Sequence, residues 1–384
     1  MYHTIRVNEA VARVGWQLQV RCVSQRPREV VATTGSIETT EYKVWLDFAE
    51  GEVLEALVNP NIGCWPSYAP LNISAGVTEI DCEPISSPRR FDWWHEAVGI
   101  SLPRPGRGRG MTIGVIDVGL DPDLPLPEAV EDLGHATRTR WQGTPDIIHG
   151  AVCASFIAAN GDEDPIEGIA PGSTVYFMAA QERFSSDRMS PTAVAQAIRQ
   201  LAAEECDLIS ISAGDTEKEQ QLVREAVKDA RRMGSLCLFA AGNSSGPPQY
   251  PACYEEIIAI GAFGRFGAQP ENSILSRSAT APAASNERHF MLSQLAFGDL
   301  VNAAGPGIGI VAPSEHAGLN RVLTGTSYAC PIVVGALAVL LSDDDRYQDL
   351  MGEARADYAR TILLRRSPPL ELGDGAAHLV CPRC

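Results

Sequence analysis

The seven residues GTSYACP, numbers 325–331, decide how the rest of this 384-residue chain is interpreted. They stand directly before an almost wholly apolar run, Ile332 to Leu341, which predicts a buried helix. Pro331 favours the first turn of that helix, because its φ is already near the helical value and it has no N–H to leave unpaired. Ser327 is therefore expected at or near a helix N-terminus. A serine in that place can be an N-cap or a reactive hydroxyl, and the rest of the sequence has to distinguish the two.

The composition excludes several classes of protein. With 45% hydrophobic and 21% charged residues, the chain has the make-up of an ordinary globular protein. It contains no run of about eighteen apolar residues and no secretory signal at its start, so we expect a cytoplasmic protein with no membrane partner. A formal net charge of −17 argues against a nucleic acid partner, because phosphate binding needs a basic surface.

The ten cysteines favour reduced thiols, since several lie within apolar patterns where free cysteine behaves as a small hydrophobe. Cys381 and Cys384, in the C-terminal CPRC, have the spacing of a metal or redox pair. No second pair or nearby histidines complete a zinc site in the sequence, so no metal site is expected there.

The pattern along the chain changes near residue 88. Before it, β-type stretches at 16–23, 42–48 and 76–82 accompany a short helical pattern at 51–60. These features predict a small α+β domain over residues 1–87, followed by a second domain over 88–384. A Pro- and Gly-rich stretch at 102–110 indicates a surface connection within the second domain.

Short apolar runs alternate with helical patterns from residue 111 onward. The runs lie at 111–117, 173–180, 207–214, 235–243 and 257–263, and the helical patterns at 151–160, 190–205 and 217–234. Strand and helix in alternation predict a mostly parallel sheet covered by helices on both faces. Active sites gather at the carboxyl ends of such strands, where Asp117, Gly214 and Asn243 stand.

Acyl transfer by a serine requires a base, a carboxylate that orients the base, and donors for the developing oxyanion. Asp117 ends a strand, which also suits a turn-forming residue. His149 precedes a helix, whose dipole favours the neutral imidazole that a base needs, although a surface histidine fits as well. Asn243 closes the stretch LFAAGN, where its amide can point into a cleft or support a tight turn.

The order Asp, His, Asn, Ser resembles that of the subtilisin-like serine proteases. The resemblance runs from about residue 88 to 380, and GTSYACP has the family's Gly-Thr-Ser-x-Ala-x-Pro form. The stretches IDVGLD, HG, GIAPG, SISAG and AAGN occur in the expected order. The resemblance implies a three-layer α/β domain with the sheet between helices. It also implies that Ser327 is the nucleophile, His149 the general base, and Asp117 the group that fixes the imidazole tautomer.

Further roles follow from the same resemblance. Asn243 would donate its amide to the oxyanion, together with the backbone N–H of Ser327. A segment that pairs with an extended substrate is implied at Ser212, Ala213 and Gly214, and a wall of the pocket for the residue before the cut at Ala240, Ala241 and Gly242.

The sequence departs from the family pattern in two places. HGAVCAS, residues 149–155, stands where the family usually has His-Gly-Thr-His-Val-Ala-Gly, which puts local packing in doubt more than chemistry. An insertion that includes residues 285–297 is open to interpretation as a lid, a partner-binding loop or a surface excursion. The acidic residues 160–165 fall where many members bind structural calcium, but such a loop is also common without an ion. The triad chemistry itself requires no cofactor.

The expected function is that of a serine protease that hydrolyses a protein or peptide substrate, selectively and inside the cell. The alternatives are a transpeptidase or macrocyclase that uses the same triad, and an inert peptide-binding module. The first domain is expected to be either a propeptide-like intramolecular inhibitor or a permanent regulatory domain.

Overall fold

The computed structural model describes most of the second domain and the strands of the first. The described residues are 1–7, 18–24, 28–32, 41–50, 52–58, 68–70, 77–80, 92–100, 106–120, 126–137, 149–161, 164, 166–182, 188–212, 216–268, 284–292, 295–313, 320–367, 369–370 and 379–380.

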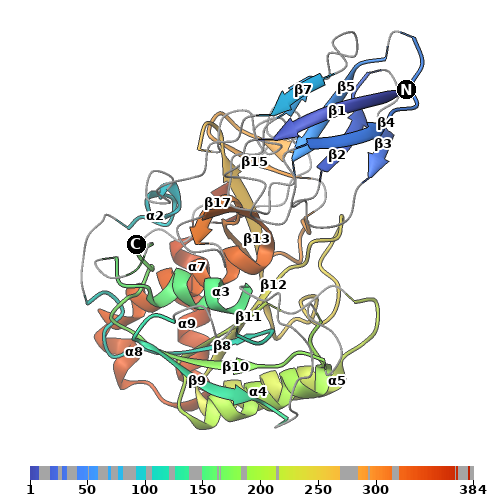
Figure 1. Ribbon diagram of the computed structural model, residues 1–384. Helices are drawn as coiled ribbons and strands as arrows, with labels where there is room; N and C mark the ends of the chain where they lie inside the picture. Colours follow the sequence, from blue (N-terminus) through green and yellow to red (C-terminus); the bar gives the residue numbers. More distant parts are fainter. Residues whose placement is uncertain are drawn as a thin grey trace.

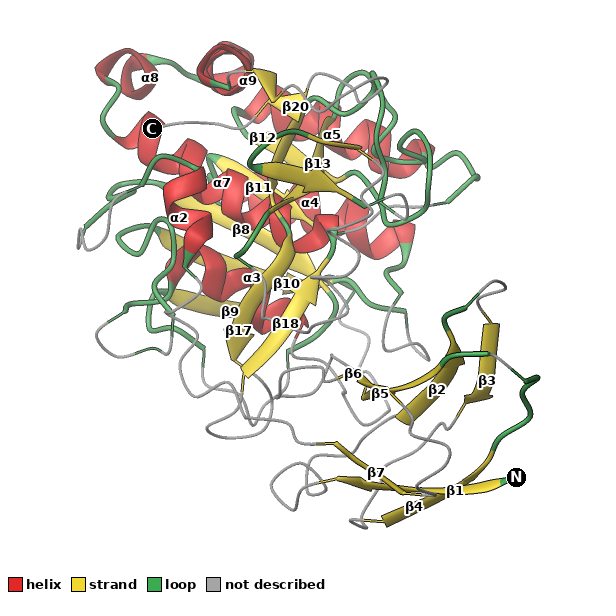
Figure 2. Ribbon diagram, turned by 90° about the horizontal axis from the view of Figure 1, so that it is seen from above, coloured by secondary structure: helices red, strands yellow, loops and turns green. Residues whose placement is uncertain are grey.

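A nine-stranded sheet forms the centre of the second domain (Figures 1 and 2). Its strands follow the order β14-β15-β13-β12-β11-β8-β10-β9, and β16 also pairs with β13. The bounds are β8 Thr112–Asp117, β9 Val130–His135, β10 Thr174–Ala179, β11 Leu208–Ile211, β12 Leu236–Ala240, β13 Ile258–Arg265, β14 Ala284–Ser285, β15 His289–Met291 and β16 Ala303–Pro306. All neighbours from β9 to β13 run parallel, as does β16, whereas β14 and β15 form an antiparallel extension. The predicted parallel sheet is thus confirmed.

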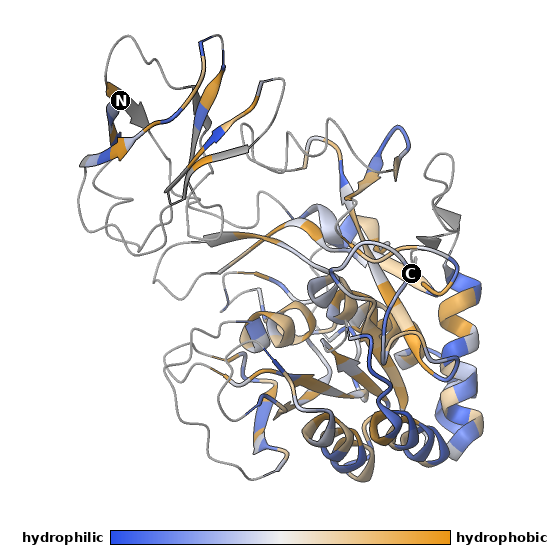
Figure 3. Cartoon of the chain, turned by 90° about the vertical axis from the view of Figure 1, so that its right-hand side faces the viewer, coloured by the Kyte–Doolittle hydropathy of each residue, from blue (hydrophilic) through white to orange (hydrophobic). Residues whose placement is uncertain are grey.

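Helices cover the sheet on both faces. Figure 1 shows α3 (His149–Ala158) and α7 (Thr326–Ser342) on one face, and α4 (Pro191–Ala203) and α5 (Gln221–Met233) on the other. Both α3 and α7 are apolar almost all round and buried, whereas α5 buries a single stripe and leaves a hydrophilic outer side. Figure 3 shows this contrast between the hydrophobic interior and the hydrophilic outer helices. The three-layer arrangement expected from the sequence is therefore present.

The remaining elements lie around these layers. They are α2 Trp93–Ala97, α8 Asp345–Asp349, α9 Gly352–Arg366, the hairpin β17 Ile308–Pro313 with β18 Asn320–Thr324, and the short pair β19 Pro369–Leu370 with β20 Leu379–Val380. In the described part of the chain, no helix is both long enough and apolar enough to cross a membrane.

The first domain contains two small sheets, of order β4-β1-β7 and β3-β2-β5-β6. Their strands are β1 Tyr2–Val7, β2 Leu18–Cys22, β3 Arg28–Ala32, β4 Glu41–Trp45, β5 Leu54–Val58, β6 Tyr68–Pro70 and β7 Val77–Ile80. The strands predicted at 16–23, 42–48 and 76–82 are confirmed. The helix predicted at 51–60 is wrong, because residues 54–58 of this stretch form β5, which pairs with both β2 and β6. Cross-strand pairing has overridden the local helical pattern.

Two further expectations need correction. Ser327 lies in the first turn of α7, as expected, but the helix begins at Thr326, so that Pro331 lies inside α7 and not in its first turn. Residues 285–297 are not a surface excursion where they are described, because Phe290, Met291 and Leu295 are buried. These apolar side chains pack in the core, and β15 pairs with β13 and so extends the sheet.

A buried polar cluster ties the C-terminal helices to the end of the sheet opposite Asp117. Asp207 is 6% exposed, and its carboxylate accepts hydrogen bonds from the hydroxyl of Tyr347 at 3.1 Å and from Nε of Arg355 at 3.0 Å. The backbone N–H of Thr112 donates to its other oxygen at 2.9 Å. Asp207 therefore joins α8 and α9 to the amino ends of β8 and β11.

We predict that Asp207→Ala lowers the free energy of unfolding by about 3 kcal/mol, because it leaves the partners of a buried carboxylate unpaired. The measurement is the urea midpoint beside that of Asp349→Ala, an exposed carboxylate at the end of α8. The control substitution should change stability by less than about 0.5 kcal/mol. Equal effects of the two substitutions would contradict this account of the cluster.

Candidate active site

Three side chains that lie far apart in the sequence form a hydrogen-bonded chain. Nδ1 of His149 lies 2.7 Å from Oδ1 of Asp117, and its Nε2 lies 2.9 Å from Oγ of Ser327. They come from the end of β8 and the first turns of α3 and α7. Because an ionised carboxylate only accepts hydrogen bonds, Nδ1 carries the proton and Nε2 accepts from the serine hydroxyl. This tautomer leaves Nε2 ready to take the proton of Ser327.

Burial differs among the three groups. Asp117 is fully buried and Ser327 is 7% exposed, whereas the side chain of His149 is 30% exposed. Oδ1 of Asp117 also accepts the backbone N–H of Val118 at 2.7 Å. In the part of the chain that the structure describes, Oδ2 has no hydrogen-bond partner. The carboxylate is thus held by a turn N–H and by the imidazole.

Burial and the neighbouring carboxylate of Asp117 have opposite effects on the pKa of His149. Burial is the largest single influence and lowers this pKa, whereas the negative charge and the hydrogen bond of Asp117 raise it, and the net result is a pKa well above the ordinary value. Asp117 faces the imidazole from β8, and Cys153 and Tyr328 face it from α3 and α7. Since only the neutral imidazole accepts a proton, the competence of this site falls as the pH drops through that raised pKa.

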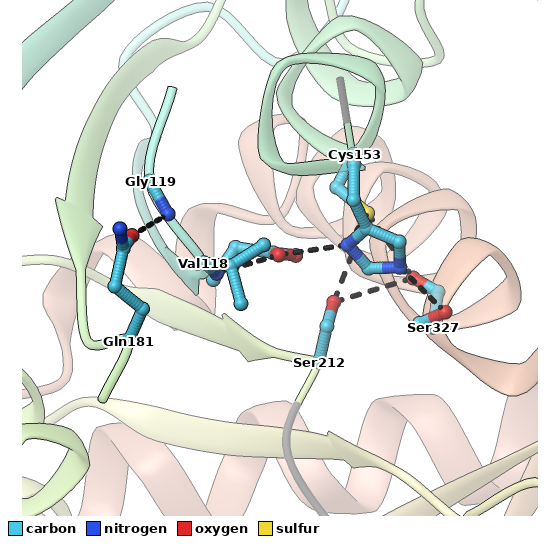
Figure 4. Close-up of polar contacts among 8 residues, drawn as sticks. Val118, Gly119, Cys153, Gln181, Ser212 and Ser327 are labelled. Atoms are coloured by element: carbon cyan, nitrogen blue, oxygen red, sulfur yellow. Dashed lines mark hydrogen bonds and ion pairs between the residues drawn. The ribbon is translucent and has the colours of Figure 1, made fainter. Parts of the chain in front are cut away.

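Because of Pro331, the carbonyl oxygen of Ser327 accepts hydrogen bonds from side chains and not from the helix backbone. In a regular helix this oxygen would accept the N–H of residue 331, which proline lacks. The thiol of Cys153 donates to it at 3.4 Å and the hydroxyl of Ser212 at 3.3 Å. Figure 4 shows the side chains of Cys153, Ser212 and Ser327 lying close to one another. The first turn of α7 is therefore fixed by α3 and by the end of β11.

Asn243 lies near Ser327, and Thr326 sets the orientation of its amide. Oδ1 of Asn243 accepts the backbone N–H of Thr326 at 3.0 Å and its hydroxyl at 3.2 Å. A Cβ atom at Gly325 would lie 3.2 Å from Oγ of Ser327 and 3.5 Å from Nδ2 of Asn243. The glycine therefore leaves open the space between the nucleophile and the amide, where an oxyanion would develop.

The family model described as the subtilase family matches residues 108–374, which is more than half of the chain. This chain belongs to the subtilase family. As a subtilase, it is a hydrolase of the serine protease class.

Two curated relatives are named as intracellular enzymes. The intracellular serine protease of Paenibacillus polymyxa is 29% identical over 297 residues, covering 71% of this chain and 80% of the relative. The major intracellular serine protease of Bacillus subtilis (strain 168) is 28% identical over 293 residues, covering 72% and 83%.

The solved structures support the fold. Sphericase superposes with a TM-score of 0.55 at 23% identity, covering 74% of this subtilase and 93% of that chain. The prenylagaramide maturation protease PagA gives 0.53 at 20% identity, covering 78% and 96%. At such identities the likeness concerns the fold alone.

The structure describes some of the residues that are expected to bind substrate. Ala240, Ala241 and Gly242 are buried at the end of β12 and just beyond it. Gly242 has a φ of +115°, which favours glycine, and its N–H donates to the hydroxyl of Thr326 at 3.1 Å. Ser212 lies at the end of β11, whereas residues 213 and 214 lie outside the described residues.

Residues 295–297 lie against the stretch that contains Asn243. The N–H of Ala296 donates to the carbonyl of Gly242 at 3.0 Å, and that of Phe297 to Gly246 at 2.8 Å. These backbone hydrogen bonds therefore hold the stretch that contains Asn243 in place.

Sequence reasoning missed the part played by Thr326. This residue is fully buried, and its hydroxyl both accepts from Gly242 and donates to Asn243. A polar side chain directly before the candidate nucleophile, at the start of a buried helix, was the available signal.

The described residues offer one group of three potential metal ligands: Asp117, His149 and Cys153, with ligand atoms within 4.8 Å of one another. Nδ1 of the histidine and Oδ1 of the aspartate are 2.7 Å apart and share a proton. A metal ion bound to both atoms, with bonds of about 2 Å each, would require Nδ1 and Oδ1 to lie farther apart than they do. The observed geometry of this group therefore does not fit a metal ion. At the acidic loop, Asn160 and Asp164 hydrogen-bond to each other, while residues 162, 163 and 165 lie outside the described residues.

We predict that Asp117→Asn lowers the rate at which a fluorophosphonate phosphonylates Ser327 by about 10⁴-fold, because asparagine stabilises the wrong imidazole tautomer. Removing the negative charge also lowers the pKa of His149, so the acid limb of the pH–rate profile should move to lower pH. Asp132→Asn, at an exposed position on β9, should change neither quantity. A limb that stays in place in Asp117→Asn would contradict the assigned origin of the raised pKa.

Proposed function

We propose that this subtilase is a selective intracellular serine endopeptidase with Asp117, His149 and Ser327 as its triad. The observation that carries the proposal is the hydrogen-bonded chain from a buried carboxylate through an imidazole to a hydroxyl at a helix start. The same three residues lie at the positions that the family motifs assign to the triad.

The proposed reaction begins when Oγ of Ser327 attacks the carbonyl carbon of a peptide bond while His149 takes the hydroxyl proton. The histidine, then charged, is stabilised by Asp117. It next donates that proton to the leaving amine, which breaks the C–N bond and leaves an acyl-enzyme. Water then attacks the ester carbon while His149 takes its proton. The bond from the carbon to Oγ breaks, His149 returns the proton to Oγ of Ser327, and the carboxylic acid product leaves.

The oxyanion is proposed to receive hydrogen bonds from Nδ2 of Asn243 and the backbone N–H of Ser327. The contacts of Asn243 with Thr326 support this role, because they direct its carbonyl oxygen away and leave its amide nitrogen toward Gly325. A preorganised donor stabilises the charge without reorganising during the reaction.

The proposed substrate is an extended segment of a protein or peptide. Ser212, Ala213 and Gly214 would pair with its main chain, which gives affinity without side-chain selectivity. Ala240 to Gly242 would form a wall beside the residue before the cut. Action inside the cell is proposed because two relatives are named intracellular proteases. No cofactor is required for the proposed steps.

The first domain is proposed to restrain the catalytic domain, as an inhibitor that the enzyme removes or as a permanent regulator. An enzyme that acts among the proteins of its own cell needs such restraint. The separate sheets of this domain, built from residues 2–80, support its treatment as a distinct unit (Figure 1).

We predict that Ser327→Ala abolishes covalent capture by a fluorophosphonate and abolishes peptide cleavage, because the nucleophile is lost. Ser342→Ala, at the other end of α7, should retain both. The measurement is intact mass after labelling, with the labelled residue located by peptide mapping. Labelling of the wild type at another serine would overturn the assignment.

We predict that Asn243→Ala lowers kcat by about 10² to 10³, the loss that removal of one oxyanion donor causes in subtilisin itself, with a small change in KM. Ser245→Ala, an exposed position in the same turn, is the control. An unchanged kcat in Asn243→Ala would remove this residue from the reaction.

We predict that mass spectrometry of peptide products shows addition of water at the cut, as hydrolysis requires. Products joined to an amine without added water would instead establish transpeptidation by the same acyl-enzyme. In the same experiment, loss of a fragment of the first domain by the wild type, but not by Ser327→Ala, would identify a self-removed inhibitor. A full-length wild type that cleaves peptides would identify a permanent domain.

A further inference from the structure

The turn that follows Asp117 is held by a side chain outside the triad. The backbone N–H of Gly119 donates to Oε1 of Gln181, whose residue is 4% exposed (Figure 4). Gln181 lies just beyond β10, the neighbour of β8, and Ala179 of β10 pairs with Asp117. The glutamine is thus placed directly across from the turn.

The fit between Gln181 and the turn leaves no spare room. A Cβ atom at Gly119 would overlap Oε1 and lie 3.2 Å from both Cδ and Nε2 of the glutamine. On the side of α3, a Cβ atom at Gly150 would lie 2.8 Å from the carbonyl oxygen of Val118. The turn of Val118 and Gly119 is therefore clamped between Gln181 and the helix start that carries His149.

Backbone interactions of Gln181 hold this residue in place. Its carbonyl oxygen accepts Nε2–H of His135 at 3.0 Å, and Nδ1 of that histidine accepts the N–H of Thr137 at 3.3 Å. Gln181 also forms an antiparallel bridge with Met189. Its side-chain amide consequently starts from a well-defined position.

We propose that Gln181 is a positioning residue for the carboxylate of Asp117. It fixes the turn whose Val118 N–H holds Oδ1 at 2.7 Å, the same oxygen that accepts from His149. Gln181 acts on the imidazole only through Asp117. This role rests on the proposed function. It makes Gln181 a fourth polar side chain, besides Asp117, His149 and Ser327, on which the geometry of the site depends.

The test uses Gln181→Met, which keeps the length of the side chain but removes the acceptor. The rate of phosphonylation of Ser327 by a fluorophosphonate is expected to fall about ten- to a hundredfold, because small displacements of reacting groups have effects of that size. kcat should fall with KM nearly unchanged. Gln200→Met removes a comparable bond, from Nε2 to the carbonyl of Ala136 at 3.1 Å, and should leave both kinetic constants unchanged.

Gln181→Glu provides a second variant that retains an acceptor for Gly119. Its added negative charge near Asp117 should raise the pKa of His149, so the acid limb of the phosphonylation profile moves to higher pH. The movement requires that the side chain of residue 181 be electrostatically coupled to the Asp117–His149 pair. If Gln181→Met does not fold, this variant carries the test, and an unmoved acid limb then overturns the proposal.

A double-mutant cycle tests whether the effect passes through the carboxylate. In an Asp117→Asn background, adding Gln181→Met should change the phosphonylation rate by less than about twofold, because the group that Gln181 positions is already lost. The same fold-loss in both backgrounds would overturn the proposal, as would a wild-type phosphonylation rate in Gln181→Met. Wild-type labelling at a serine other than Ser327 would instead refute the proposed function, which separates the two failures.

Discussion

A carboxylate buried within the protein is the constraint on which the rest of the site depends. Asp117 ends a central strand with no solvent exposure, where an unpaired charge would be costly. The fold supplies two N–H groups to one of its oxygens, from Val118 and from His149. To do so, α3 has to begin against the turn after β8, and Gly150 permits this close approach. The negative charge in turn favours the imidazolium that a general base must become.

The departures from the usual family sequence acquire a physical reason in the structure. Cys153 occupies a position where valine is usual, and its thiol serves the carbonyl that Pro331 leaves without a helical partner. Burial raises the pKa of this thiol, which suits a hydrogen-bond donor rather than a nucleophile. Ser155, in place of the usual glycine, returns its hydroxyl to the carbonyl of Ala151 at 2.8 Å within α3. These changes alter packing and hydrogen bonding while keeping the base in place.

Local patterns predicted most of the second domain because its strands are continuous apolar runs and its helices carry clear end signals. Pro191 does open α4, and Gly234 does close α5 with a φ of +108°. The patterns failed where distant pairing decides the outcome, as in β5, and where a proline is accepted inside a helix, as in α7. Candidate triad residues were found from motifs, but the support that Thr326 gives to Asn243 depends on contacts between residues 83 apart in sequence. Such a contact leaves no periodic signal in the sequence.

The separation of the three central residues along the chain has a consequence for synthesis. Asp117 and His149 are synthesised first, whereas Ser327 follows 178 residues after His149, on a helix that packs against both α3 and the sheet. A nascent chain that lacks α7 has neither Ser327 nor the apolar side chains of α7 that pack against α3. The three side chains therefore cannot come together until the ribosome has passed α7.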